Sequence, residues 1–348
     1  MPGHDIIVVG ASAGGVEALV KLVGQLPADL PAAVFVVLHI PAESPSLLPD
    51  ILNRAGPLPA SQPVDNEEIR LGHIYVASPD YHLLIERGRT RNVHGPRENR
   101  HRPAIDPLFR SAAYFYGPCV VGVVLTGSLD DGTAGLLAVK RRGGIAVVQD
   151  PKDAVYPSMP RSALAHVRVD YCLPLADIGE VLAQLSHQQA KDEAAFPAPD
   201  AMAQETRYTS MDDQNTLDSD ERKGTPSAFS RPDCGGVLWE LHDGELLRFR
   251  CRVGHAFSVD SVLAAQSEQL ETALWAALKT LEEHASLSRR LARQAQGRGQ
   301  DWLARNFEEQ VREADQRAIT IRQVLKKEQP DESAGNGSRP VDFGNKAG

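Results

Sequence analysis

Three kinds of side chain that can hydrolyse an ester stand directly after apolar runs of the sequence. Ser12 lies in a Gly-x-Ser-x-Gly segment, His39 ends a later run, and Asp130 and Asp131 follow a third. A serine hydroxyl becomes a nucleophile when a histidine takes its proton and a carboxylate orients that histidine. The pattern predicts a serine-type hydrolytic site, in which either aspartate could supply the carboxylate.

Each of these side chains also has another interpretation. A glycine-rich turn can hold a phosphate, but the dinucleotide fingerprint needs glycine where Ser12 stands, and the Lys-Ser/Thr of a P-loop is missing. Ser12 could simply cap a helix, His39 could be structural, and Asp-Asp-Gly could be a turn. The order Ser, His, Asp along the chain excludes the α/β-hydrolase fold, which places the acid before the histidine.

The residues around these side chains predict an α/β fold. Short apolar runs of this kind suit strands covered on both faces of a parallel sheet. Amphipathic patterns at 16–26 and 132–143 separate them and predict helices. We expect a doubly wound, mostly parallel, Rossmann-like sheet. Its strands are expected at residues 5–10, 32–40, 73–78, 120–127 and 144–150.

Composition excludes several classes of protein. Apolar residues make up 42% and charged residues 24% of the 348 residues, as in ordinary globular proteins. The net charge of −9 argues against a protein that coats nucleic acid. Four cysteines are too few for a secreted disulfide scaffold. The start has no signal-peptide form and no run reaches about 18 apolar residues, so we expect a cytoplasmic protein without membrane insertion.

Composition also divides the chain. We expect a catalytic domain over 1–188 and a flexible linker over 189–228, which carries nine acidic and four basic side chains and almost no apolar period. A Cys/His segment follows at 229–260. Two apolar stripes at helical spacing then predict an α-helical hairpin over 261–328, and the residues 329–348 are expected to be a disordered tail.

Five motifs within residues 3–186 resemble, in order and spacing, the catalytic domain of chemotaxis protein-glutamate methylesterases of the CheB type. They read GASAGG, VVLHIP, GHIYVASPDYH, GPRENRHRPAID and LTGSLDDGTAG. The resemblance implies hydrolysis of glutamate methyl esters on chemoreceptors to glutamate and methanol, and among related enzymes the deamidation of glutamine. It also implies that Ser12 is the nucleophile, His39 the base and Asp131 the acid that orients it.

The sequence departs from the family pattern around the site. Ala13 stands where the family often has Thr, Asp130 where it often has Asn, and Ser128 where it commonly has Met. The resemblance implies that the backbone N–H at position 128 helps to form the oxyanion hole, with Ala13 as a second supporting residue, and a backbone donor survives the change. Because the sequence begins at the catalytic domain, we expect control of activity by something other than the in-chain receiver domain usual in the family.

A cluster of basic residues lies within the fourth motif. Arg97, Arg100 and Arg102, with His101 between them, could bind carboxylates that flank the methyl ester on an acidic receptor helix. The alternative is structural, with Arg102 or Asn99 bracing loops near the site. None of these residues is predicted to be catalytic.

The Cys/His segment resembles a zinc ribbon that has lost a ligand. Cys234, Cys251 and His255 match the expected ligands, but Arg231 stands where the pattern has cysteine. A structural zinc site normally has four ligands, and His242 could supply the missing one. We expect no cofactor, with structural zinc as the weaker alternative.

The sequence therefore predicts a cytoplasmic serine-type protein-glutamate methylesterase in chemotaxis-type signalling. Its expected partners are a methylated chemoreceptor or related sensor and a signalling partner bound by the C-terminal helices, with no nucleic acid. The alternative from another class is a non-catalytic signalling scaffold that keeps the fold for binding. A nucleotide-binding Rossmann domain is the third alternative.

Overall fold

A seven-stranded parallel sheet forms the centre of the N-terminal half of the chain. The computed structural model describes residues 3–210, 224–231 and 235–328. The strand order is β3-β4-β2-β1-β7-β8-β9, and every neighbouring pair is parallel. The strands are β1 (Ile6–Ala11), β2 (Ala33–Leu38), β3 (Ala60–Ser61), β4 (Ile74–Val76), β7 (Val120–Val124), β8 (Ile145–Gln149) and β9 (Tyr171–Leu173). The five predicted strands are all present, which confirms the doubly wound α/β fold.

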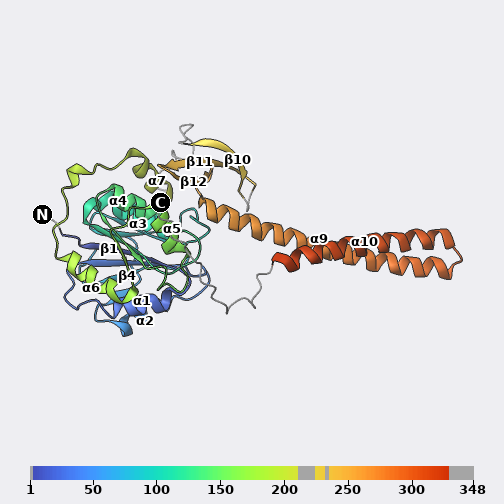
Figure 1. Ribbon diagram of the computed structural model, residues 1–348, viewed down its shortest axis with the longest axis horizontal. Helices are drawn as coiled ribbons and strands as arrows, with labels where there is room; N and C mark the ends of the chain where they lie inside the picture. The colour runs from blue at the N-terminus through green and yellow to red at the C-terminus, as the bar shows by residue number, and fades with distance from the viewer. Residues whose placement is uncertain (1–2, 211–223, 232–234, 329–348) are drawn as a thin grey trace, which may run out of the picture. The chain divides into compact units, whose positions relative to one another are not determined.

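Helices cover both faces of this sheet. In Figure 1, α1, α2 and α6 lie on one side of it, and α3, α4 and α5 lie on the other. Their bounds are α1 (Gly15–Val23), α2 (Leu48–Ala55), α3 (Ile105–Tyr116), α4 (Thr133–Arg141), α5 (Ser158–His166) and α6 (Leu175–Ser186), with a 3-10 turn η1 (Gly117–Cys119) before β7. An antiparallel hairpin, β5 (His82–Glu86) and β6 (Arg89–Val93), packs against α3.

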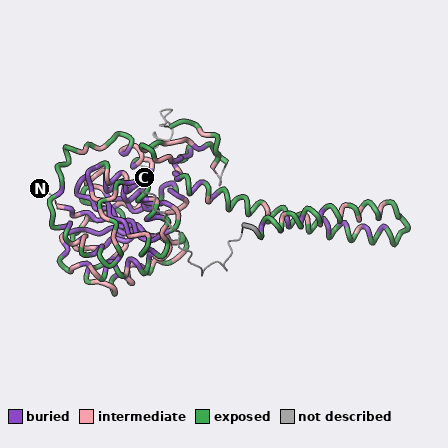
Figure 2. Tube along the Cα trace, viewed as in Figure 1, coloured by how far each residue is buried: buried purple, intermediate pink, exposed green. Residues whose placement is uncertain are grey.

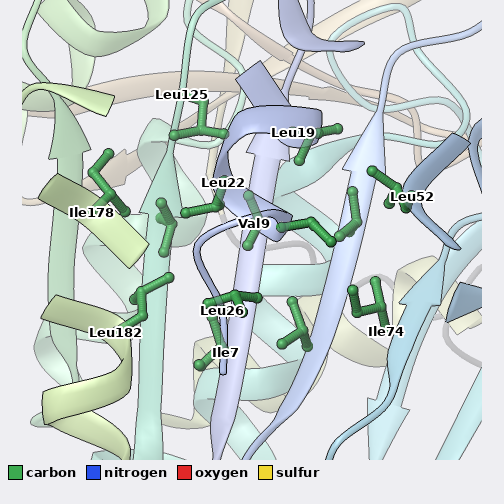
Figure 3. Close-up of a cluster of buried hydrophobic side chains, with 14 of the residues drawn as sticks. Ile7, Val9, Leu19, Leu22, Leu26, Leu52, Ile74, Leu125, Ile178 and Leu182 are labelled. Carbon is green, nitrogen blue, oxygen red and sulfur yellow. The ribbon is translucent and has the colours of Figure 1, made fainter. Parts of the chain in front are cut away.

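The strands are apolar along their whole length because both faces are buried. All six residues of β1 and of β2 are buried. Alternate side chains enter two separate cores: Ile7 and Val9 contact α1 and α6, whereas Ile6 and Val8 face α3. Figure 3 shows the first core, in which Leu19 and Leu22 of α1 pack on the sheet, and Figure 2 shows the buried strands between the exposed outer faces of the helices. This double burial explains why the sequence reads as continuous apolar runs.

The predicted linker contains ordered elements in its described part. A 3-10 turn η2 (Glu193–Ala195) and the helix α7 (Asp200–Ser210) occupy it, and α7 packs against α3. The prediction of a flexible segment over 189–228 is therefore wrong for α7. The prediction assumed that the acidic side chains of this segment are solvated. Glu205 instead pairs with Arg248 at 2.7 Å and with Arg110 at 3.4 Å. The remaining linker residues 211–223 lie outside the described ranges.

A small antiparallel sheet, here called the ribbon, follows in the order β10-β11-β12-β13. Its strands are β10 (Thr225–Ser230), β11 (Val237–Asp243), β12 (Leu246–Cys251) and β13 (Ala256–Ser258). Leu238, Phe249 and Phe257 form its core. The described chain divides into two compact units, and the first ends at Leu263, so the ribbon belongs to the same unit as the large sheet.

The second unit begins at Ala264 and is an antiparallel helical hairpin, as the sequence predicts. It consists of α9 (Val259–Gly297), whose first residues belong to the first unit, and α10 (Asp301–Glu328). Leu278, Ala318 and Leu325 are buried between the two helices. Among the described residues, no helix combines the length and the apolar character needed to cross a bilayer. The predicted tail 329–348 lies outside the described residues.

Candidate active site

Ser12 follows β1 on a tight turn that leads into α1. Its backbone N–H donates to the Thr126 carbonyl at 3.0 Å, which joins the turn to the loop after β7. Gly14 has a φ of 71°, a conformation that few other residues adopt, and it allows the chain to reverse directly after the serine. Gly127 lies so close that a Cβ built there would be 2.9 Å from the Ser12 Cβ. Ser12 itself is half-buried, so a substrate can reach its hydroxyl.

The three predicted catalytic side chains meet at the carboxyl ends of β2, β1 and β7, which are neighbours in the sheet. His39 Nδ1 lies 3.1 Å from Ser12 Oγ, and His39 Nε2 lies 2.7 Å from Asp131 Oδ2. An ionised carboxylate can only accept hydrogen bonds, so Nε2 carries the proton of the neutral ring. The lone pair of Nδ1 then faces the serine hydroxyl, as a base requires.

Amide donors surround the Asp131 carboxylate. It accepts hydrogen bonds from the backbone of Ile105 at 2.7 Å and of Gly132 at 3.0 Å, and from Asn99 Nδ2 at 2.8 Å. Burial by itself raises the pKa of Asp131, but the hydrogen bond and charge of His39 and the donors Ile105 and Asn99 hold that pKa well below its ordinary value. Asp131 is therefore ionised at neutral pH although it is almost completely buried.

A second buried carboxyl, that of Asp106, shares this site. Burial, and then the negative charge of Asp131, raise the pKa of Asp106 well above its ordinary value. Two neighbouring carboxylates in one buried site do not both ionise easily, so the proton stays on Asp106 and the charge on Asp131. Asn99 Nδ2 lies between them, 2.9 Å from Asp106 Oδ2.

His101 forms a wall of the site that the sequence did not indicate. Its ring stacks on His39 with centroids 3.7 Å apart and an angle of 12° between the planes. Burial, together with the charge of His39, lowers the pKa of His101 to about 4. The ring is thus neutral near pH 7 and packs on the imidazole of His39.

Two backbone N–H groups follow the residues that meet at the turn, Ala13 after Ser12 and Ser128 after Gly127. Within the described part of the chain, the N–H groups of Ala13 and Ser128 donate to no protein acceptor. Thr126 Oγ1 donates to the Ala13 carbonyl at 3.0 Å, which fixes that peptide. These are the two residues predicted to support the oxyanion, and the substitutions at both positions leave the backbone N–H unchanged.

A pocket of about 510 Å³ opens above Ser12 and His39. The basic residues predicted to bind substrate differ in their surroundings. Arg97 is exposed at the rim. Arg102 instead donates to Asp80 at 2.7 and 3.0 Å and to the Gly95 carbonyl at 2.7 Å, so it braces the loop. The lining consists of Ser12, Ala13, His39, Ile40, Pro41, Ala42, Arg97, Arg100, His101 and Arg102.

A family model described as CheB methylesterase matches residues 7–182, the region that carries this site. The chain belongs to the CheB methylesterase family. This membership confirms the resemblance seen in the sequence, and the large sheet is the CheB catalytic domain.

Relatives of this domain are similar over the same half of the chain. A protein of Leptospira interrogans named a putative protein-glutamate methylesterase/protein-glutamine glutaminase is 41% identical over 183 residues, which are 52% of this chain and 95% of that protein. One of Hydrogenovibrio crunogenus is 37% identical over 188 residues, but these are only 50% of its length. The crystal structure of the Thermotoga maritima CheB methylesterase catalytic domain matches with a TM-score of 0.51 and 33% identity, covering 53% of this chain and all of that one.

Asp130, next to Asp131, is expected to make the stability of the folded chain depend on pH. Burial raises its pKa to about 6. The folded state therefore binds this proton more tightly than the unfolded state, and the resulting stability is complete below about pH 4 and lost as the pH rises through 6. The shift corresponds to an upper limit of about 3 kcal/mol.

We expect Asp130→Asn to raise the free energy of unfolding relative to the wild type, with a gain that grows from pH 4 to pH 7 and is constant above. Urea unfolding of both proteins at each pH measures it. Asp29→Asn, at an exposed carboxylate, controls for the loss of one negative charge. A gain for Asp130→Asn that did not change with pH would contradict the assignment.

The Cys/His segment fits a closed zinc site poorly in its described residues. Arg231 Nη1 lies 3.0 Å from His255 Nδ1, so a permanent cation points at the nitrogen that would bind the metal. Cys251 Sγ lies 3.6 Å from the same nitrogen, and Cys234 lies outside the described residues. His242 is on β11, largely exposed and 4.0 Å from Glu240. No group of three metal-binding side chains gathers within the described ranges.

We expect the purified chain to carry less than about 0.1 zinc per chain, because the site lacks the four ligands of structural zinc. Mass spectrometry of bound metal checks this. The variant Arg231→Cys restores the fourth ligand and should bind about one zinc per chain. One zinc in the wild-type protein, with a fall in Tm on chelation, would contradict this expectation.

Proposed function

We propose that the chain hydrolyses glutamate methyl esters on proteins, with Ser12, His39 and Asp131 as its catalytic triad. One observation carries the proposal: a single imidazole stands 3.1 Å from a reachable serine hydroxyl and 2.7 Å from a buried, ionised carboxylate. The CheB family membership supports the reaction class. The match to the Leptospira protein over 95% of its length supports the substrate class.

In the first half of the reaction, Ser12 Oγ attacks the ester carbonyl carbon and its proton passes to His39 Nδ1. The positive charge that forms on the imidazole is stabilised by Asp131. The N–H groups of Ala13 and Ser128 donate to the negative oxygen of the tetrahedral intermediate. His39 then returns the proton to the departing oxygen, so that methanol leaves and a glutamyl ester of Ser12 forms.

In the second half, water attacks this ester and gives a proton to His39 Nδ1. The intermediate collapses, Ser12 Oγ takes the proton back, and glutamate is released. A glutamine side chain can follow the same steps with ammonia as the leaving group. The names of the relatives, which include glutaminase, favour this second substrate.

We propose a methylated chemoreceptor or related sensor as the substrate protein. The pocket carries Arg97 and Arg100 beside the serine, and these cations can bind carboxylates that flank the methyl ester. The chain has only four cysteines, and the three in the described residues are free thiols, which favours a reducing compartment such as the cytoplasm.

Reversing the charge of Arg97 should weaken binding of the acidic substrate without affecting the triad. We expect Arg97→Glu to raise KM for a methylated receptor about tenfold and to leave kcat within about twofold, because the lost contact acts equally on substrate and transition state. Arg54→Glu on α2, outside the pocket lining, is the matched control. Equal KM values for the two variants would exclude a role of Arg97 in binding.

The predicted role of the C-terminal helices in binding a signalling partner stays a prediction. The hairpin exposes large apolar side chains, among them Leu270, Leu287 and Trp302, and these support the idea of a binding surface. The scaffold alternative, in which the whole chain only binds, makes a different prediction for the active site.

The direct test is methanol release from a methylated chemoreceptor by the full chain, measured by gas chromatography. A fluorophosphonate probe should label Ser12 in parallel, as peptide mass spectrometry would show. Receptor binding without methanol release and without labelling would reject the esterase and favour the scaffold.

A further inference from the structure

The ribbon contacts the loop that carries the donors of the catalytic aspartate. The N–H of Ala256 in β13 donates to the Arg97 carbonyl at 3.2 Å, and the N–H of Asn99 donates to the Ala256 carbonyl at 2.9 Å. Through these bonds, Glu98 of the loop forms a parallel β-bridge with Ala256 of β13. The ribbon lies outside residues 7–182, the region that the family model matches.

The side-chain amide of Asn99 is bonded on both of its ends. Nδ2 donates to Asp131 Oδ1 at 2.8 Å and to Asp106 Oδ2 at 2.9 Å. Oδ1 accepts from the backbone N–H of Ser258, at the end of β13, at 2.9 Å. Asn99 is only 4% exposed and has a φ of 49°, so water has little access to replace these bonds.

The Ser258 N–H decides which way the amide points. A backbone N–H can only donate, so it selects the oxygen of Asn99 and directs the NH2 group to the two carboxyl groups. If the amide turned over, its oxygen would face Asp131 and its NH2 group would face another donor. Both changes would leave buried polar groups without partners.

The ribbon end is anchored at several further points. Ser258 Oγ donates to Asp130 Oδ1 at 2.6 Å and accepts from the N–H of Ser261 at 3.1 Å in the first turn of α9. On the other side of the loop, Glu98 accepts from Arg110 at 2.6 Å, and Arg250 of β12 lies 3.8 Å from the same carboxylate. The position of the Ser258 N–H is therefore fixed relative to the active site.

We propose that Asn99 and the ribbon residue Ser258 are positioning residues for catalysis. Ser258 orients the Asn99 amide, and Asn99 keeps Asp131 charged and aligned with His39 Nε2. The inference rests on the proposed function, because alignment of Asp131 matters only if His39 acts as a base. It makes the ribbon a part of the catalytic apparatus.

Variants of the full chain test two contacts separately: the donation from Asn99 to Asp131 and the donation from the Ser258 N–H to Asn99. Asn99→Ala removes both donations, and Asn99→Asp keeps an acceptor for Ser258 but replaces the two N–H donors by a carboxyl group, which donates only when it is protonated. Ser258→Pro removes the N–H that orients Asn99, and this N–H bonds to Asn99 rather than to β12. Proline also removes the Oγ bonds to Asp130 and to the Ser261 N–H, so Ser258→Ala, which loses these two bonds but keeps the N–H, separates the two effects. Ser261→Ala is the matched control, since within the described residues the buried Ser261 hydroxyl has no hydrogen-bond partner.

We expect Asn99→Ala and Asn99→Asp to lower kcat about 10- to 100-fold with KM within about twofold, as for loss of a hydrogen bond to a charged group. Ser258→Pro should lower kcat about tenfold through the same step. Nitrogen-15 NMR of the His39 ring supplies a readout that a merely structural role would not move. The wild type and Ser261→Ala should show the proton on Nε2 alone, whereas the Asn99 variants should show a mixture of tautomers.

The inference is overturned if folded Asn99→Ala keeps its kcat and a single His39 tautomer. It is also overturned if folded Ser258→Pro behaves as Ser258→Ala in both measurements, because the two variants differ in the N–H that bonds to Asn99. Should Ser258→Pro fail to fold, Asn99→Ala decides, because wild-type kcat and a single His39 tautomer in that variant would exclude a donor role for Asn99. A wild type that releases no methanol would reject the proposed function, while the tautomers would still report the positioning.

Discussion

Replacing Ser12 by alanine is expected to lower kcat for methanol release about 10⁴- to 10⁶-fold, the largest effect of any single change in this chain. The variant leaves His39 with no nucleophile to activate, so only transition-state binding by the oxyanion donors remains. KM should change little, because the serine hydroxyl contributes one small group to the pocket. Ser12 is half-buried on a tight turn, and alanine fits this turn without strain.

Ser12→Ala must be measured in the same receptor preparation as the wild type, with Tm as the check on folding. Ser286→Ala, at an exposed serine of α9, is the matched control and should keep full activity. The fluorophosphonate label should disappear in Ser12→Ala and persist in Ser286→Ala. Methanol release by Ser12→Ala at the wild-type rate would exclude the serine mechanism.

The second large effect is expected for Asp131→Asn, which should lower kcat about 10⁴-fold. An asparagine amide at this position can donate to His39 Nε2, and the imidazole would then carry its proton on Nδ1. That proton would face the Ser12 hydroxyl, so the histidine could no longer act as the base. Since Asp131 also accepts from Ile105 and Gly132, the variant is expected to lose stability as well.

Asp130→Asn is the matched control for this change, one residue away. It keeps an oxygen that can accept from Ser258 Oγ, and within the described residues Asp130 makes no hydrogen bond to His39. We expect its kcat to stay within about threefold of the wild type, because a substitution away from the reacting groups has a small effect. If Asp130→Asn were as inactive as Asp131→Asn, the choice between the two aspartates would be wrong.

The main sheet could be predicted from sequence because its strands are buried on both faces. Runs such as 5–10 and 120–127 must be apolar throughout, and Gly or polar residues end them where the chain turns. The parallel arrangement then places Ser12, His39 and Asp131 at one edge, since side chains that follow parallel strands share that edge. Local sequence therefore predicted that a serine, a histidine and one of two aspartates meet, and the family resemblance selected Asp131.

Contacts between distant segments could not be predicted in the same way. Asn99 looks like an ordinary loop residue, and its partner Ser258 lies 159 positions further along the chain. His101 was recognised only as part of a basic cluster, but burial against His39 makes it neutral. The helix α7 lies in acidic sequence, and the arginines of α3 and β12, together with the buried Met202, explain why it packs. A local sequence pattern does not indicate contacts between residues so far apart in the chain.

The ribbon's bonds to the Asn99 loop limit how freely this catalytic domain can be exchanged between proteins. If residues after 188 were removed, Asn99 Oδ1 would lose its donor, and Glu98 and Arg110 would lose the cover of α7 and β12. A chimera that joins this ribbon to another member's domain should therefore function only if the loop and β13 are transferred together.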